Sequence, residues 1–456
     1  MAPRRRAVLG AAASGLSLLA GCPTGERGRS SDGGPEDGGP EDGRPEDGGE
    51  DLTTATGGHT VSPRVDDGLV GYTHVRASGN RVLGGNGGLS GDEPVTVETD
   101  GRPTWLVAVP TDPGSDWLVA TADGVVERFA VSDGAVTERC RVGELPGGTP
   151  PVGRREAARI DLLDPLEDAS TYSHPVPVDD AGQLFVDADG GLVLVDGDDR
   201  QRAAVDALPD ARPVAVGPGR YALLGGRTER YPHGALGDAV EAERVVLADV
   251  REGLSTRTVV DLDGPVVEGI APVAADVTGD GIRNLLVTLA DSQSGARLAA
   301  FTTEGDRVAT GPGFSSGNRW RHQLCVAPFG PDGELEVAAV ETPHIGGTAR
   351  FYRRDGDELR SVTSRSGVSS HAYRSRNLDG GLAADVDGDG RPELVVPTDR
   401  RGGLLALART EDGVEVRRRF ALGGELASNV TGVRNVDDSL ALGAAGSDGV
   451  VRVWGE

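Results

Sequence analysis

One pattern recurs along this chain from about residue 100 onward: an apolar strand, a polar turn, a second apolar strand, a Gly-rich turn and a third apolar segment. The three clearest copies lie at 271–289, 324–342 and 381–399. Weaker copies are found at 105–134, 174–198, 212–226 and 427–454. These copies give a mean repeat of about fifty residues, a length typical of architectures built from one repeated unit.

Each copy predicts an antiparallel meander of three or four strands with apolar faces. Such a sheet alone leaves both faces exposed, whereas radial packing covers each face with a neighbouring sheet. We therefore expect an all-β fold, a seven-bladed β-propeller over 59–456, although a ring of six or eight blades fits the spacing almost as well. Because the last copy ends within a unit, we expect 94–99 to supply its outer strand. The insertion at 146–172 is expected to form a loop with a short helix.

The turn between the first two strands carries regularly spaced oxygen donors in two copies. In the copy at 381–399 the donors are Asp385, Asp387, Asp389, the carbonyl of Arg391, and Glu393. In the copy at 271–289 they are Asp276, Thr278, Asp280, the carbonyl of Ile282, and Asn284. Alternate residues of a curling loop point inward, and such an array suits a hard cation such as Ca²⁺. The alternative is an acidic turn that holds no ion.

The spacing in these loops, with Glu-Leu-Val-Val at 393–396, resembles the FG-GAP (integrin-α-like) and VCBS repeat families. The copy at 324–342 is similar too, with Phe329-Gly330 where the family's name motif would lie. The resemblance covers about residues 100–456 and is strongest over 265–400. It implies a propeller with calcium in the blade hairpin loops. In the copy at 324–342, Pro328 and Gly330 occupy the first two donor positions, so we expect no ion there.

The charge of the chain limits its partners. The sequence contains 72 Asp and Glu against 46 Lys and Arg, for a formal net charge of -26, and every one of those basic residues is Arg. A surface this acidic repels nucleic acid and anionic lipid, so we expect neither as a partner. Carboxylates also keep a protein soluble in brine, where salt screens their mutual repulsion. The composition is therefore typical of a halophilic archaeon.

The N-terminus resembles an export signal followed by a lipid anchor. Arg5 and Arg6 precede an apolar stretch that is too short to span a bilayer and ends in Leu-Ala-Gly before Cys22. This arrangement is similar to a twin-arginine signal over 1–21 with a lipobox, and implies lipid attachment at Cys22. Residues 22–58 repeat Pro-Glu-Asp-Gly and predict a disordered acidic tether. We therefore expect a monomer, exported by the twin-arginine route and anchored at the extracellular face of the membrane.

The remaining chemical signals are weak. His322 and His371 precede strands expected to lie near the axis, but no two histidines share a metal-ligand spacing. Trp320, between two arginines, is the best single candidate for contact with a sugar or an anion. Cys140 and Cys325 are expected to be two free thiols, with a disulfide between them left open. Asn429 begins a glycosylation sequon, but we expect its strand to hide it.

No nucleophile elbow, Walker loop or Rossmann fingerprint is present. We therefore expect a non-catalytic, calcium-binding surface lipoprotein that serves adhesion, glycan binding or protein interaction. The runner-up hypothesis is an extracellular polysaccharide lyase or hydrolase on a calcium-stabilised propeller. The sequence does not identify the ligand, because propellers host unrelated functions on one scaffold.

Overall fold

The computed structural model describes residues 68–71, 79–89, 93–156, 159–178, 182–314 and 319–455. The predicted export signal, Cys22 and the acidic tether therefore lie outside the described residues. In the described part of the chain, no helix is long and apolar enough to cross a membrane.

All regular structure in these residues is β-strand, and most strands pair into seven antiparallel units of four. The first three units comprise β4 (Pro103–Pro110), β5 (Ser115–Thr121), β6 (Val125–Ser132) and β7 (Ala135–Glu144); β10 (Val176–Val178), β11 (Gly182–Val186), β12 (Gly191–Asp196) and β13 (Asp199–Ala204); and β14 (Val214–Gly217), β15 (Arg220–Thr228), β16 (Glu241–Asp249) and β17 (Ser255–Asp261). The next three comprise β18 (Val266–Ala275), β19 (Asn284–Ala290), β20 (Arg297–Phe301) and β21 (Arg307–Thr310); β22 (Arg321–Ala327), β23 (Glu336–Glu341), β24 (Gly347–Asp355) and β25 (Glu358–Val368); and β26 (Leu382–Asp385), β27 (Glu393–Pro397), β28 (Gly403–Thr410) and β29 (Gly413–Ala421). The last comprises β30 (Thr431–Arg434), β31 (Leu440–Ala445), β32 (Val450–Trp454) and β3 (Val95–Glu98).

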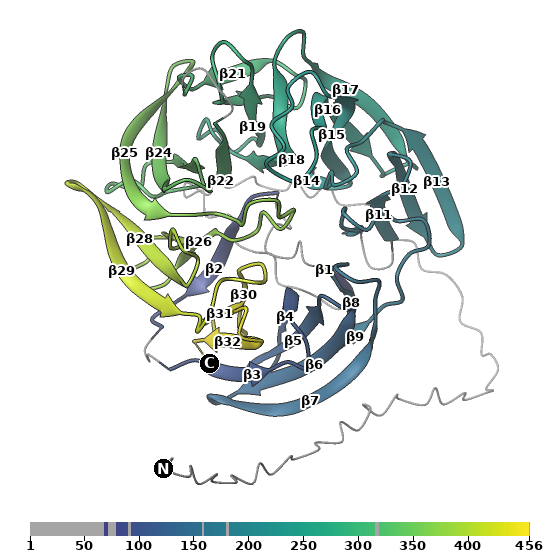
Figure 1. The fold of residues 1–456 in the computed structure, drawn as a ribbon, viewed down its shortest axis with the longest axis vertical. Coiled ribbons are helices and arrows are strands. Elements are labelled where there is room, and N and C mark those ends of the chain that lie inside the picture. Colours follow the sequence, from purple (N-terminus) through teal and green to yellow (C-terminus); the bar gives the residue numbers. More distant parts are fainter. Residues whose placement is uncertain are drawn as a thin grey trace, which may run out of the picture.

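These units follow one another around a central axis, as Figure 1 shows, so the β-propeller class is confirmed. The prediction that a strand from before residue 100 completes the last unit is also confirmed, because β3 pairs antiparallel with β32. Val97 of this strand shares a core cluster with Leu106 of the first unit and Val433 of the last. The strand that precedes the first unit thereby completes the last unit and closes the ring.

The burial of each strand follows from its place in a unit. The second strands, such as β5 and β19, are buried at every position because neighbouring units cover both of their faces. The fourth strands, such as β25 and β29, alternate exposed polar residues with partly buried ones. This gradient from apolar inner strands to polar outer strands is why the repeated sequence pattern predicts a ring.

A small additional sheet lies outside the seven units. It consists of β1 (Gly68–Gly71), β8 (Val152–Glu156) and β9 (Arg159–Leu162), with β8 paired to both neighbours. The expectation of a short helix within 146–172 is therefore wrong for its described residues. The residues of β8 and β9 include Val152 and Ile160, which are buried, and Ile160 joins the core cluster of the first unit. A strand pair buries these alternating apolar residues against that unit.

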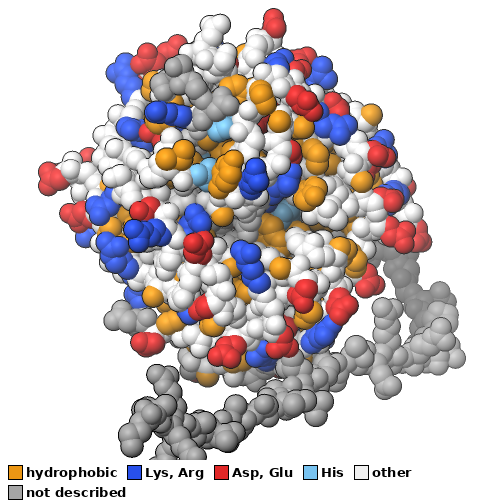
Figure 2. All heavy atoms as spheres, viewed as in Figure 1, with side chains coloured by type: hydrophobic (Ala, Val, Ile, Leu, Met, Phe, Trp, Pro, Cys, Tyr) orange, Lys and Arg blue, Asp and Glu red, His pale blue; other side chains and the backbone are white. Residues whose placement is uncertain are grey.

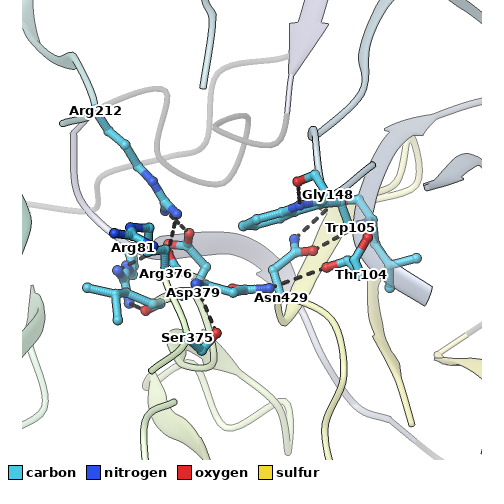
Figure 3. Close-up of polar contacts among 12 residues, drawn as sticks. Arg81, Thr104, Trp105, Gly148, Arg212, Ser375, Arg376, Asp379 and Asn429 are labelled. Atoms are coloured by element: carbon cyan, nitrogen blue, oxygen red, sulfur yellow. Dashed lines mark hydrogen bonds and ion pairs between the residues drawn. The ribbon is translucent and has the colours of Figure 1, made fainter. Parts of the chain in front are cut away.

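Two segments close the centre of the ring. β2 (Val82–Asn86) pairs in parallel with β26, and Arg81 just before it forms an ion pair with Asp379 at 3.1 Å. Asp379 belongs to the connection between β25 and β26, which also receives Arg212 from the start of the third unit (Figure 3). Arg212 also donates a hydrogen bond of 2.7 Å to the carbonyl oxygen of Arg376. These contacts tie three units together across the axis.

The structure tests the predictions for Asn429, Cys325 and Cys140. The Asn429 side chain donates to, and accepts from, the backbone of Leu106 at 3.0 and 2.8 Å and is 1% exposed, so the sequon is not accessible in the folded chain. Cys325 is buried and forms no disulfide with Cys140. The expectation of two free thiols is wrong for Cys140, which is not free.

Candidate metal centre

The loop at 385–393 joins the first two strands of the sixth unit. β26 ends at Asp385 and β27 begins at Glu393, and Glu393 pairs with Ala384 in the strand register. The two Asp385 oxygens accept hydrogen bonds from the amides of Gly388 and Gly390 at 2.7 and 3.0 Å. Both glycines have positive φ angles, of 79° and 84°, which glycine adopts without strain. The sequence thus curls the loop around the first carboxylate.

This curl gathers three carboxylates. One oxygen each from Asp385, Asp387 and Glu393 lie within 4.8 Å of one another, and this is the one such group found among the described His, Cys, Asp and Glu residues. Asp389 lies outside the group, and its Oδ1 accepts a hydrogen bond from the amide of Arg391 at 2.9 Å. The structure therefore brings together three of the predicted side-chain ligands and leaves the fourth at the rim.

Among the described residues, the negative charge of this site has no positive counterpart of equal size nearby. Glu393 is 1% exposed, and burial, with Asp387 and Asp389 nearby, raises its pKa to about 7. Burial likewise raises the pKa of Asp385. The cluster forms an ion pair with Arg417, whose Nε lies 3.7 Å from Asp387 Oδ2. Oxygen donors crowded together at the cost of raised pKa values fit a hard cation.

A cavity of about 320 Å³ adjoins this cluster at Glu393, between the loops of the fifth and sixth units. Asp389 and Glu393 line it from one side, and Phe329 and Asp332 from the other. A cation held at the cluster would therefore keep room for water ligands, which calcium sites commonly include.

The loop at 276–284 has the same backbone arrangement with less charge. Asp276 accepts hydrogen bonds from the amides of Gly279 and Gly281 at 2.6 and 2.8 Å. The Asn284 amide oxygen accepts from the Val277 amide at 3.0 Å, as Glu393 does from Val386 at 2.8 Å. Asp280 accepts from the amide of Ile282, and Thr278 donates to Asp276. The fold thus repeats, but a neutral amide replaces the buried carboxylate.

The loop at 328–336 balances its buried carboxylate differently. Glu336 occupies the position of Glu393 in the strand register, since it pairs with Ala327 as Glu393 pairs with Ala384. It is 1% exposed and accepts hydrogen bonds from Arg353 at 2.8 Å and Arg409 at 2.9 Å. Two guanidinium groups neutralise Glu336, whereas the corresponding Glu393 of the sixth unit would need a bound cation. The absence of an ion from this loop stays a prediction, now with a physical reason.

The structure also assembles a histidine cluster that sequence spacing missed. The rings of His322 and His371 lie 5.2 Å apart, and His344, from the turn after β23, lies 4.4 Å from His371. These histidines come from three separate segments, so no local sequence motif could predict that they form a cluster. Trp320 packs within this cluster and is 3% exposed, so the expectation that it contacts a sugar is wrong. Its neighbour Arg321 is buried as well and pairs with Glu341.

Comparison with known proteins identifies no family. No family model matches the chain, and no curated protein matches it. Among solved structures, the chain is similar to the β-propeller domain of Cps50 (Swd1) from Myceliophteria thermophila, at 13% identity and a TM-score of 0.43. The match covers 80% of this chain and 99% of that one. The resemblance to FG-GAP and VCBS repeats therefore continues to rest on the loop motifs.

Proposed function

We propose that this chain is a non-catalytic, calcium-binding β-propeller that acts as an interaction scaffold at the cell surface. The observation that carries the proposal is the convergence of Asp385, Asp387 and Glu393 in one hairpin loop. All three offer oxygen, with no sulfur or imidazole donor, and such sets suit calcium or magnesium rather than transition metals. The irregular, partly solvated loop favours calcium, which tolerates flexible geometry.

The ion acts on stability. Without it, the buried Glu393 and its neighbours repel one another, so the hairpin is held against an unfavourable electrostatic energy. A calcium site with a dissociation constant on the order of 0.1–1 mM would be occupied outside a cell. When the free calcium concentration is ten to one hundred times the dissociation constant, calcium binding stabilises the folded state by about 1.4–2.7 kcal/mol.

The surface location rests on the sequence. A lipid at Cys22, the tether at 22–58 and the acidic composition support a propeller held away from the outer face of a membrane. The partner in this proposal is a protein or a glycan, and nucleic acid is excluded by charge. The protein acts as a monomer whose faces are free to bind.

The test compares thermal unfolding of the soluble chain with and without calcium for wild type, Asp387→Asn and Asp332→Asn. Asp332 is an exposed aspartate in the arginine-paired loop, so the same Asp→Asn change there serves as the control. Wild type and Asp332→Asn should melt higher in calcium, whereas Asp387→Asn should lose most of that shift. Equal calcium shifts in all three proteins, or none in wild type, would contradict the proposal.

A further inference from the structure

A second cluster of side chains lies near the centre of the ring, on the face drawn in Figure 2 (the axial face), and shares no residue with the loop at 385–393. Figure 2 shows histidine atoms at the surface around the centre of the ring. His344 follows β23, and His371 lies in the connection between β25 and β26. His371 is 2% exposed, whereas His344 is partly exposed, so the pair is anchored in the core and reachable from solvent.

The two imidazoles meet through their nitrogens. His344 Nε2 and His371 Nε2 lie 2.8 Å apart, while the ring centroids are 4.4 Å apart and the ring planes are 87° from parallel. Zinc–nitrogen bonds of about 2.0–2.1 Å, at angles from square to tetrahedral, place two such nitrogens about 2.9–3.4 Å apart. The pair therefore needs to open by only a few tenths of an ångström to hold one ion.

The other ring nitrogen of His371 is held by a serine. Ser370 Oγ lies 2.9 Å from His371 Nδ1 and 2.9 Å from His322 Nδ1. When Ser370 donates to His322 and accepts from the Nδ1–H of His371, the lone pair of His371 Nε2 faces His344. Metal-binding histidines are typically oriented in this way, by a hydrogen bond to the nitrogen that does not bind the ion.

The backbone of the two segments is tied together and strained at this place. Ser369 Oγ lies 2.9 and 3.1 Å from the carbonyl oxygens of Pro343 and His371 and shares its one proton between them, which links the two segments. Thr342, two residues before His344, has a φ angle of 47°. That conformation is unfavourable for a β-branched residue, and such strain persists where the surrounding structure enforces it.

Burial disfavours the charged form of both rings. Burial lowers the pKa of His344 to about 4, and burial together with His344 lowers that of His371. Neutral imidazole is the form that binds metal ions, and binding requires that the proton shared between the two Nε2 atoms move to His344 Nδ1. A hard cation such as calcium prefers oxygen, whereas imidazole suits zinc, copper and nickel.

We propose that His344 and His371 form a binding site for a single divalent transition-metal ion such as Zn²⁺. Among the described residues, no third His, Cys, Asp or Glu places a donor within 4.8 Å of both nitrogens. The remaining coordination positions are therefore open to water or to a donor from a bound partner. Exposed Ile345 and Tyr373 flank the site, which places these open positions at the surface of the axial face.

The proposal is tested by titrating the tag-free chain with ZnCl₂ in an isothermal calorimeter, in saturating calcium so that the loop at 385–393 is occupied. The variants are His344→Gln, which removes one ligand, and Ile345→Ala, the matched change at the neighbouring exposed position. Wild type and Ile345→Ala should each bind one additional ion, and His344→Gln should bind it about tenfold more weakly or not at all. Zinc binding that is absent from wild type, or unchanged in His344→Gln, overturns the proposal.

Two further measurements make the result independent of the calcium proposal and of folding. Glu393→Gln should lose its calcium-dependent melting shift yet keep the zinc site, because the two sites share no residue. The X-ray absorption spectrum of the zinc-loaded wild type should show two imidazole nitrogens in the first coordination sphere. A spectrum with oxygen donors alone would place the ion elsewhere and contradict the assignment.

Discussion

The loops at 385–393 and 328–336 occupy the same place in neighbouring units but neutralise a buried glutamate in different ways. Both end in a glutamate that is 1% exposed, Glu393 in one and Glu336 in the other. Glu336 pairs with Arg353 and Arg409, and its loop lacks carboxylates at the first two donor positions. Glu393 instead shares its loop with Asp385 and Asp387.

The difference teaches how one hairpin is kept with or without an ion. A buried carboxylate must be compensated, because an unpaired charge in a low-dielectric site is costly. Arg409 comes from the third strand of the sixth unit, so the pairing with Glu336 also joins two blades. The loop at 276–284 shows a third solution, in which Asn284 removes the charge altogether. Repeats of one fold thus differ in how the side chain at the ninth loop position is compensated.

The largest effect should come from removing an arginine. Arg409→Met leaves Glu336 with Arg353 alone and also removes hydrogen bonds to the carbonyl oxygens of Thr410 and Gly413. We expect the free energy of unfolding to fall by about 3 kcal/mol, because a buried pair is broken. Chemical denaturation with and without calcium should give the same loss, since the arginine-paired loop needs no ion.

Adding Glu336→Gln to Arg409→Met should restore part of that stability by removing the stranded charge. A double variant as unstable as the single one would show that Arg409 acts through packing rather than charge.

A smaller effect, confined to calcium, is expected at Glu393. Glu393→Gln keeps an acceptor for the Val386 amide, as Asn284 does for Val277 in the neutral loop. The variant should lose about 1.4–2.7 kcal/mol of calcium-dependent stabilisation and be no less stable than wild type in chelator. Melting curves at several calcium concentrations measure both quantities. Lower stability of the variant in chelator would mean that ionised Glu393 is favourable without an ion.

The same glutamate predicts a pH dependence. Its pKa rises from 4.5 to about 7 in the ion-free fold, so the folded state keeps a proton that the unfolded state releases. Its contribution to stability is therefore fully present below pH 4.5 and is lost as the pH rises to about 7. Ion-free wild type should lose more stability than Glu393→Gln across this window, and calcium should abolish the difference. Parallel pH profiles would contradict the shift.

The smallest effect should follow from giving the neutral loop its missing carboxylates. Thr278→Asp with Asn284→Glu places acids at the positions held by Asp387 and Glu393 in the other loop. The calcium-dependent gain in stability should increase by about 1 kcal/mol, because affinity rises with ligand charge. Equilibrium dialysis should show tighter or additional calcium binding, and unchanged binding would show that loop sequence alone does not make a site.

Much of the fold was predictable because it depends on local patterns. The apolar repeats located the inner strands of every unit, and the segment at 94–99 contained the strand that closes the ring. The loop at 385–393 was predictable for the same reason, since its donors lie within nine residues and its glycines fix the curl. The exclusion of Asp389 from the gathered group depends on how the turn aims each side chain, which spacing does not reveal.

The parts that escaped prediction are long-range. His344 and His371 meet because two connections converge at the axis, and Arg409 reaches Glu336 from a different blade. The same convergence buries Trp320, which its sequence neighbours suggested to be exposed. The hairpin of β8 and β9 forms against β1, about eighty residues earlier in the chain, so its own residues gave no clear strand pattern.

The most direct measurement is a crystal structure of the chain grown in calcium, with anomalous difference density to locate the ions. We predict a peak coordinated by Asp385, Asp387 and Glu393, and no peak at Glu336, which keeps both of its arginines. A structure with no ion between the three carboxylates, or with the Arg417 guanidinium moved in to neutralise them, would contradict the account.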